Sequence, residues 1–199
     1  MIPSGYLDIF PNLVTLSVIH NQIEHIEEND TLTIPSSTKT ALLHNNHLSA
    51  INLQLRGNLS ALEMLDVGIN RLTDFPYIRG PIARVVQTLL LDYNHLTMIS
   101  TSDMLHFVAL QYLNIMENDI TRIGEFSLTF RSEFHFEVNN NPLHCDSQVM
   151  WMKKITEQLL ELTTSPQPCA APSELAAQDW DDIHIDECEL WLKKTFLCC

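Results

Sequence analysis

Apolar side chains recur along the chain in a fixed frame, and residues 110–120 (LQYLNIMENDI) are its clearest copy. In this copy, apolar residues fill the first, fourth, sixth and eleventh places, and an asparagine fills the ninth. The frame returns at residues 13–23, 38–48, 62–72, 86–96 and, degraded at its start, 133–143. The ninth-place asparagines recur every 23 to 25 residues: Asn21, Asn46, Asn70, Asn94, Asn118 and Asn141. Six copies in near-constant register predict a repeat architecture of stacked coils.

The alternation at the fourth and sixth places predicts a short β-strand in each repeat, with one face directed inward. The asparagine should then turn the chain, and its amide should satisfy backbone groups where water is excluded. Replacing one of these asparagines by Ala is expected to cost roughly 1–3 kcal/mol. Further apolar residues should close the coils and line the outer limbs, among them Leu7, Phe10, Ile26, Ile51, Phe75, Ile99, Met104, Phe107 and Ile123.

This pattern resembles the leucine-rich repeat in its extracellular form of about 24 residues. The resemblance implies an α/β solenoid, a leucine-rich-repeat horseshoe with a parallel concave sheet, irregular convex limbs and a helical C-terminal cap. Residues 1–12 are then the tail of an incomplete preceding repeat, residues 13–141 six repeats, residues 142–190 a cysteine-rich cap and residues 191–199 a tail. Because no capping sequence precedes residue 13, we expect an exposed first coil and a chain that is the C-terminal part of a longer protein.

The cap begins where Pro142 stops the repeat and Cys145 follows it. Residues 147–162 have the amphipathic pattern of a helix. The segment resembles the C-terminal cysteine-rich cap of extracellular leucine-rich-repeat proteins, and that resemblance implies a disulfide between Cys145 and Cys169.

The cap departs from the family's Cys-Asp-Cys pattern, because Ser147 stands where the second cysteine is expected. Cys188 therefore lacks the partner that the resemblance implies. It is either free or bonded to Cys198 or Cys199, and the sequence leaves these alternatives open.

The balance of charge narrows the class of partner. The chain has 11 basic and 25 acidic side chains, a formal net charge of -14. Nucleic acids and anionic membrane surfaces attract clustered Lys and Arg, so this balance argues against both, whereas it is compatible with a basic protein partner. No apolar run reaches the ~18 residues of a membrane span, so we expect no membrane insertion by this segment.

Two features favour the outside of the cell. Asn29 and Asn58 each begin an Asn-x-Ser/Thr triplet on an outer limb, where a glycan would be tolerated. Together with the implied disulfide, they predict an extracellular location, secreted or as the ectodomain of a membrane protein. The first residues lack the pattern of a signal peptide.

Catalytic and metal-binding patterns are missing from the sequence. It contains no GxSxG, HExxH, phosphate-binding loop or dinucleotide fingerprint, so we predict neither enzyme activity nor a cofactor. His44 and His47 have a ligand-like spacing, yet a metal site needs convergent donors and a second shell, and solvated histidines are the better interpretation. The acidic stretch 174–189 does not match a calcium-binding EF-hand loop.

The exposed places of each repeat should line the concave face, at the third, fifth, seventh and eighth positions. They mix aromatic and aliphatic side chains with carboxylates, and such residues anchor protein interfaces. We therefore predict a protein-binding recognition module of receptor, adhesion or immune type. The alternatives are an intracellular scaffold or enzyme regulator, or a concave face that takes no part in binding. The expected ligand-binding residues are Asp66, Leu90, Asp92, Tyr93, Tyr112, Met116, Glu117 and His135.

Overall fold

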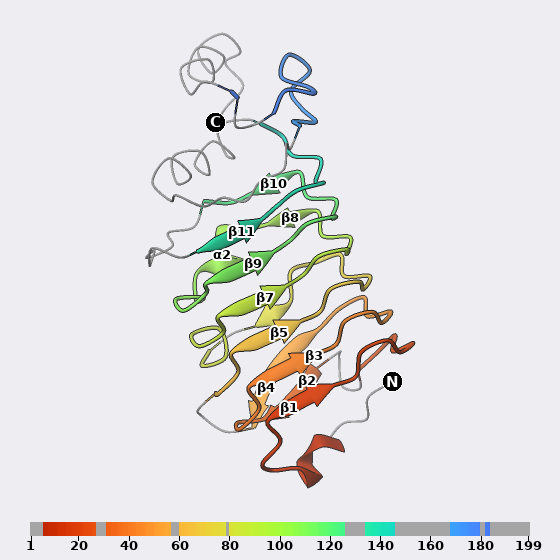
Figure 1. Cartoon of the computed structure of the whole chain (residues 1–199), viewed down its shortest axis with the longest axis vertical. Coiled ribbons are helices and arrows are strands. Elements are labelled where there is room, and N and C mark those ends of the chain that lie inside the picture. Colours follow the sequence, from red (N-terminus) through yellow and green to blue (C-terminus); the bar gives the residue numbers. More distant parts are fainter. Residues whose placement is uncertain are drawn as a thin grey trace.

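Successive coils stack along the long axis of the molecule, with the first coil at one end and the disulfide-bonded segment at the other (Figure 1). This arrangement is seen in a computed structural model, which describes residues 6–26, 31–56, 60–78, 80–125, 134–145, 168–179 and 182–183. The predicted cap helix at residues 147–162, Cys188, Cys198, Cys199 and the glycosylation sites Asn29 and Asn58 lie outside these residues.

Each repeat contributes one strand to a six-stranded parallel sheet. The strands are β1 (Thr15–Ser17), β3 (Thr40–Leu42), β5 (Met64–Asp66), β7 (Thr88–Leu90), β9 (Tyr112–Asn114) and β11 (His135–Glu137), in that spatial order. The register pairs equivalent residues of successive repeats, for example Thr88 with Tyr112 and Tyr112 with His135. In every strand the central residue is buried and its two neighbours are not, as the alternation predicts.

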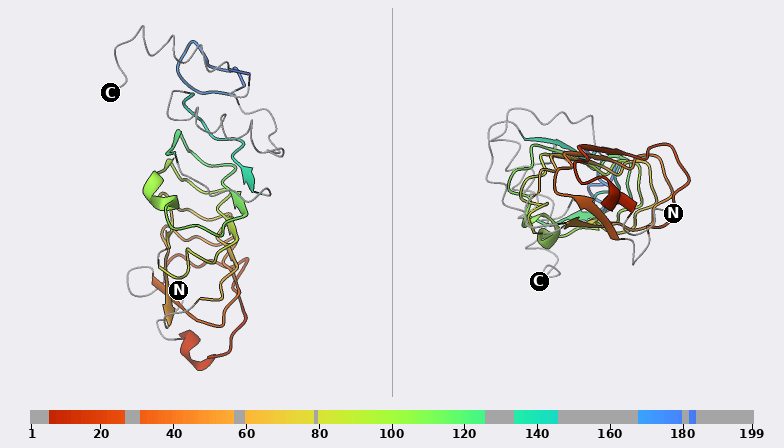
Figure 2. Two further views of the ribbon diagram at one scale, coloured as in Figure 1. Left: turned by 90° about the vertical axis from the view of Figure 1, so that its left-hand side faces the viewer. Right: turned by 90° about the horizontal axis from the view of Figure 1, so that it is seen from below.

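The opposite side of the coils also carries strands. A parallel sheet of three strands joins β2 (Thr31–Pro35), β4 (Asn52–Arg56) and β6 (Tyr77–Ile78), and a parallel pair joins β8 (Met98–Ile99) and β10 (Arg122–Ile123). The remaining elements are the short helices η1 (Tyr6–Ile9) and α2 (Thr101–Met104). Figure 2 shows the coils from the side and from one end.

These convex strands correct the prediction of irregular limbs. Leu32 and Ile34 alternate with threonines in β2, and both side chains are buried. Limbs of similar length lie beside one another in the stack, so that their backbone donors and acceptors can pair from coil to coil.

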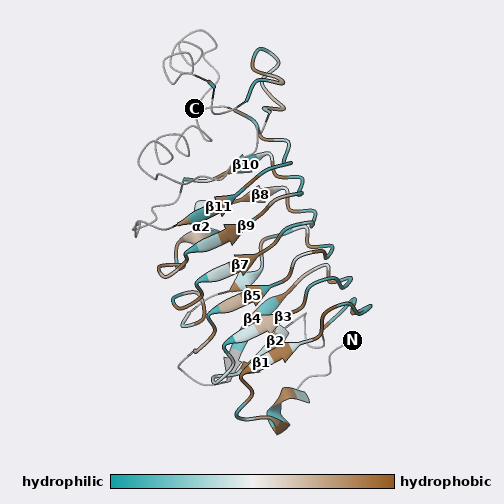
Figure 3. Ribbon diagram, viewed as in Figure 1, coloured by the Kyte–Doolittle hydropathy of each residue, from teal (hydrophilic) through white to brown (hydrophobic). Residues whose placement is uncertain are grey.

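The core is a continuous column of the predicted inward residues. The fourth-place leucines of three central repeats, Leu65, Leu89 and Leu113, are fully buried. Figure 3 shows how apolar and polar residues alternate along the coils. One predicted limb residue differs: the Phe10 side chain is 45% exposed, with its ring edge-on to Tyr6.

The disulfide between Cys145 and Cys169 is present, with 5.7 Å between the two Cα atoms. Both cysteines are buried, so the bridge belongs to the core. Backbone hydrogen bonds reinforce it, because the Cys145 N–H donates to the Ala171 carbonyl at 2.7 Å and the Ala170 N–H donates to the Leu143 carbonyl at 2.8 Å. The bridge thus ties residues 168–179 to the last repeat.

Candidate functional site

The turn asparagines form a ladder that fixes the edge of the concave sheet. In the coil of Asn70, the side-chain Nδ2 donates to the carbonyls of Val67 and Gly68, each at 3.0 Å. The same nitrogen donates to the carbonyl of Leu43 in the preceding coil at 3.2 Å. The Asn70 Oδ1 accepts the N–H of Leu48, also in the preceding coil, at 3.0 Å. One buried amide therefore binds two coils together.

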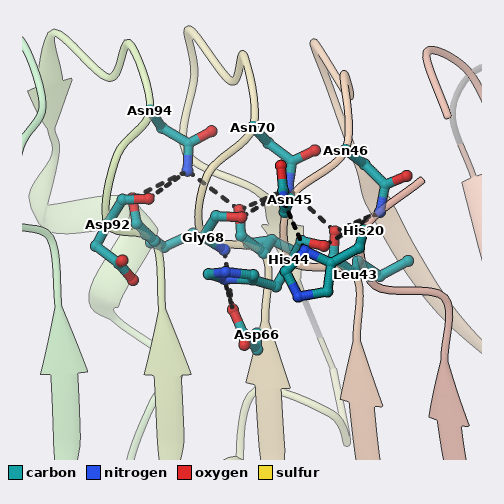
Figure 4. A network of polar contacts seen from close by, with 12 residues as sticks. His20, Leu43, His44, Asn45, Asn46, Asp66, Gly68, Asn70, Asp92 and Asn94 are labelled. Carbon is teal, nitrogen blue, oxygen red and sulfur yellow. Dashed lines mark hydrogen bonds and ion pairs between the residues drawn. The ribbon is translucent and has the colours of Figure 1, made fainter. Parts of the chain in front are cut away.

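The same set of hydrogen bonds recurs at four further positions, Asn46, Asn94, Asn118 and Asn141. All four are buried, and Figure 4 shows Asn46, Asn70 and Asn94 side by side along the stack. Asn21 differs because it is exposed and its Nδ2 reaches the carbonyls of Val18 and Ile19 in its own coil. The five buried asparagines thus each bond backbone groups of two successive coils, whereas Asn21 bonds backbone groups of its own coil.

The eighth place of every repeat has left-handed backbone. The φ angles lie between 47° and 58° at His20, Asn45, Ile69, Tyr93, Glu117 and Asn140. The strands end at the fifth place. The seventh and eighth places, which we expected to line the concave face together with the strand residues, therefore lie in the turn that follows each strand. The ladder asparagine explains this turn, because its Nδ2 bonds the seventh-place carbonyl and draws the backbone back on itself. Eighth-place side chains consequently sit at the rim of the concave face.

Four of the expected ligand-binding residues lie on the strands themselves. Asp66, Leu90, Tyr112 and His135 end or begin the neighbouring strands β5, β7, β9 and β11. The rings of Tyr112 and His135 are in contact, with their centroids 6.3 Å apart. Burial and a hydrogen bond to the Glu137 carboxylate raise the pKa of Tyr112 to about 12.

The other four lie in the turns. Asp92 and Met116 occupy seventh places, and the Met116 N–H donates to the Asn114 side chain at 3.0 Å. Tyr93 and Glu117 occupy left-handed eighth places. The Tyr93 side chain is 52% exposed, whereas the Glu117 carboxylate accepts a hydrogen bond from the Asn140 amide at 2.7 Å. The eight residues thus divide between the sheet and its rim.

A polar cluster that the sequence did not reveal surrounds Gly68. The Asp66 carboxylate accepts the Gly68 N–H at 3.0 Å and lies 3.6 Å from the His44 Nδ1 (Figure 4). A Cβ added to Gly68 would come within 2.8 Å of the Asp92 carboxylate and 3.2 Å of the His44 ring. The available signal was the glycine itself, because every other repeat has a side chain at the seventh place.

Burial raises the pKa of Asp92, and the neighbouring Asp66 and Glu137 carboxylates add to the increase. A hydrogen bond to its own backbone and the proximity of His44 act in the opposite direction. Among the residues that the structure describes, no Lys or Arg forms an ion pair with Asp66 or Asp92. The Lys39 ammonium pairs with the Glu63 carboxylate, with 3.0 Å between Nζ and Oε1.

The described residues provide neither a cluster of metal ligands nor a membrane-spanning helix. They contain no group of three or more His, Cys, Asp or Glu side chains that could hold a metal ion. No helix within the described ranges has the length and apolar character needed to cross a membrane.

Comparison with known sequences gives one relative of modest similarity. The chain is 26% identical over 143 residues to a leucine-rich repeat and fibronectin type III domain-containing protein 1-like protein of Danio rerio. The match covers 65% of this chain and 20% of the relative, so the chain spans about a fifth of that protein's length. No family model matches the chain.

Solved structures share the fold. The human 5T4 structure (Wnt-activated inhibitory factor 1, trophoblast glycoprotein) aligns with a TM-score of 0.53 at 14% identity, covering 89% of this chain and 87% of that one. The glycosylated Toll–Spatzle complex of Drosophila aligns with a TM-score of 0.52 at 18% identity, covering 92% of this chain and 30% of that one.

The Danio rerio relative is named for the repeat that the sequence pattern resembles, and the two solved structures share the parallel coils. Since the repeat frame, the asparagine ladder and these likenesses agree, the chain has the fold of a leucine-rich-repeat solenoid.

Proposed function

We propose that the chain is an extracellular recognition module that binds a protein ligand on its concave face. The observation that carries this proposal is the register of the sheet. It sets Asp66, Leu90, Tyr112 and His135 on four adjacent strands, whose spacing the ladder keeps fixed. A preformed, rigid surface loses little conformational entropy when it binds, so it suits specific recognition of another protein.

The surface has the chemistry of a protein interface. Leu90 and Met116 are aliphatic anchors, and Tyr93 and Tyr112 are the aromatic type enriched at binding hot spots. The carboxylates of Asp66, Asp92 and Glu117 lie on the same face or at its rim. Together with the formal net charge of -14, they favour a ligand that presents Lys or Arg.

The extracellular part of the proposal rests on the cysteines and on the solved neighbours. Disulfides persist in oxidising compartments, and the Cys145–Cys169 bridge is buried in the fold. Among the structural neighbours, Toll is solved in complex with Spatzle, and 5T4 is named a trophoblast glycoprotein. These likenesses support a protein ligand and an extracellular location for this chain.

The ligand face is tested by a binding screen against arrayed secreted and cell-surface proteins. A partner found with the wild-type chain is measured again with the double variant Leu90→Ala and Tyr112→Ala. Loss of hot-spot residues should weaken binding by about 2 kcal/mol or more, roughly thirtyfold. A matched control changes the exposed convex residues Tyr77 and Met98 to Ala and should bind as the wild type does. If the concave double variant binds the partner with wild-type affinity and the convex double variant binds it more weakly, the ligand does not bind on the concave face.

The location is tested by peptide mapping without reduction, on protein isolated from its natural source. A Cys145–Cys169 bridge, with or without sugar on Asn29 and Asn58, supports the extracellular module. Five free thiols and bare asparagines would instead favour the intracellular scaffold or regulator.

A further inference from the structure

The turn after β5 contains a residue that its backbone does not favour. Ile69 has a φ of +47°, and a β-branched side chain is an outlier in this left-handed region. Asparagine, which tolerates the conformation well, fills the equivalent place at Asn45 and Asn140. Ile69 is 39% exposed and is not among the residues of the core, so core packing does not account for the strained backbone. The isoleucine therefore costs stability without a matching gain in packing.

The surrounding structure imposes this conformation on whatever residue stands there. The Ile69 N–H donates to the Asp92 carbonyl of the next coil at 2.9 Å, and the Ile69 carbonyl accepts the Asn46 N–H of the preceding coil at 3.2 Å. The Asn70 side chain donates a hydrogen bond to the carbonyl of Gly68, the residue just before Ile69. The ladder thus sets the backbone, and the fold itself does not require isoleucine. Ile69 breaks the rule that β-branched residues avoid left-handed backbone, and nothing in its packing compensates for this. We infer that its exposed side chain has a role outside folding.

The neighbours of Ile69 indicate what that role is. Tyr93 occupies the same place in the next coil, where its carbonyl accepts the Asn70 N–H at 3.2 Å, and its side chain is exposed as well. Two large apolar side chains thus stand on adjacent coils at the rim. Immediately inward, the Asp92 and His44 side chains lie against the buried Gly68. The Asp66 carboxylate accepts the Gly68 N–H, so the Asp66 and Asp92 carboxylates flank this glycine. Neither carboxylate has a Lys or Arg partner among the residues described, and burial makes Asp92 a poorly solvated anion.

We propose that Ile69, Asp92 and Tyr93, here called the Ile69 edge, form the subsite that receives a ligand segment carrying an aliphatic side chain next to Lys or Arg. The aliphatic group packs on Ile69 and Tyr93, and the cation meets the carboxylates around Gly68. This inference deepens the proposed function and rests on it, since the Ile69 edge is continuous with the concave face. Charge complementarity selects a basic segment over an acidic one.

Three synthetic peptides of equal length test the chemistry of the partner: alternating Arg-Leu, alternating Arg-Ser and alternating Glu-Leu. Their affinities for the wild-type chain are measured by fluorescence anisotropy at physiological salt. The Arg-Leu peptide should bind at least tenfold more tightly than either of the others, because it alone supplies both groups. Failure of all three to bind, or equal affinity for the Arg-Leu and Glu-Leu peptides, overturns the proposal.

The variant Ile69→Asn separates binding from folding. Asparagine suits the left-handed turn, so the variant should melt at the wild-type temperature or above it while binding the Arg-Leu peptide at least tenfold more weakly. The matched control is His20→Asn, at the same place in the first coil with a φ of 55°, and it should bind as the wild type does. A lower melting temperature for Ile69→Asn, or unchanged peptide affinity, contradicts the inference.

A protein partner from the binding screen distinguishes the two proposals. If the Leu90 and Tyr112 double variant no longer binds that partner but Ile69→Asn still does, the proposal for the Ile69 edge is wrong and the concave-face function stands. If neither variant weakens the partner, both proposals fail.

Discussion

The first and fifth coils have the same frame of apolar places, yet they differ in burial. In the fifth coil Ile115 and Ile120 are fully buried, whereas their first-coil counterparts Val18 and Ile23 are only partly buried. Asparagines behave in the same way, since Asn118 is buried and Asn21 is exposed. The difference shows that burial in this fold comes from the neighbouring coil and not from the repeat itself, as expected for a stack whose stability is a sum of nearest-neighbour terms.

The largest expected effect is the loss of a core leucine from the interior. Leu113→Ala should lower the free energy of unfolding by roughly 2–5 kcal/mol, because the cavity lies between two packed coils. The matched first-coil change, Val18→Ala, should cost about 1 kcal/mol or less, since Val18 is only partly buried. Urea denaturation measures both. A loss below about 0.5 kcal/mol for Leu113→Ala would contradict the register of the core.

Substitutions of the turn asparagines test the same difference between an interior coil and the first coil. Asn94→Ala removes the buried acceptor of the Leu72 N–H and should cost roughly 1–3 kcal/mol. Asn21→Ala should change stability by about 0.5 kcal/mol or less, because the exposed side chain binds only its own coil. Equal losses in a denaturant series would show that the bonds between coils add nothing beyond the local turn.

The packing between coils also shifts the pKa of a buried carboxylate. Burial between neighbours raises the pKa of Asp92, so the folded state binds its proton more tightly than the unfolded chain does. Ionisation therefore lowers stability as the pH rises from the ordinary value of 3.8 through the raised pKa. Asp92→Asn should melt above the wild type at neutral pH and lose that advantage below pH 3.8. Thermal melts from acid to neutral pH test this, and a lower melting temperature at neutral pH would be the opposite result.

The smallest effect concerns Tyr112, whose pKa of about 12 reflects burial first and the Glu137 carboxylate second. Glu137→Gln should bring the pKa down from that value toward the ordinary 10, without reaching it, because the burial remains. Stability at neutral pH should change little, since the phenol is protonated there in both states. Phenolate absorbance during an alkaline titration gives the midpoint. If the titration midpoint of Tyr112 is unchanged in Glu137→Gln, the Glu137 carboxylate does not raise the pKa of Tyr112.

The sequence was a good guide where one residue type performs one local task in every coil. The inward leucines and the turn asparagines repeat at equal spacing, so their register could be predicted without a structure. The convex strands were missed, although the alternation around Leu32 and Ile34 in β2 carries a signal for one of them.

The chemistry around Gly68 could not be predicted. His44, Asp66 and Asp92 belong to three successive repeats, and their approach depends on side-chain geometry across coils. The left-handed turn was also hidden, since Ile69 and Tyr93 are residue types that normally argue against it.

The asparagine ladder gives the stack a direction. Both ends of each ladder side chain reach back to the coil before it, as when Asn118 accepts the Leu96 N–H and donates to the Leu91 carbonyl. Every coil is therefore completed by the one that follows. Removing a coil from the N-terminal side leaves an asparagine in the situation of Asn21, exposed and still bonded to its own coil. Removing a coil from the C-terminal side instead takes away the asparagine to which an N–H and a carbonyl of the preceding coil are bonded. Shortened versions of this solenoid should tolerate trimming from the first end and need a substitute cap at the other.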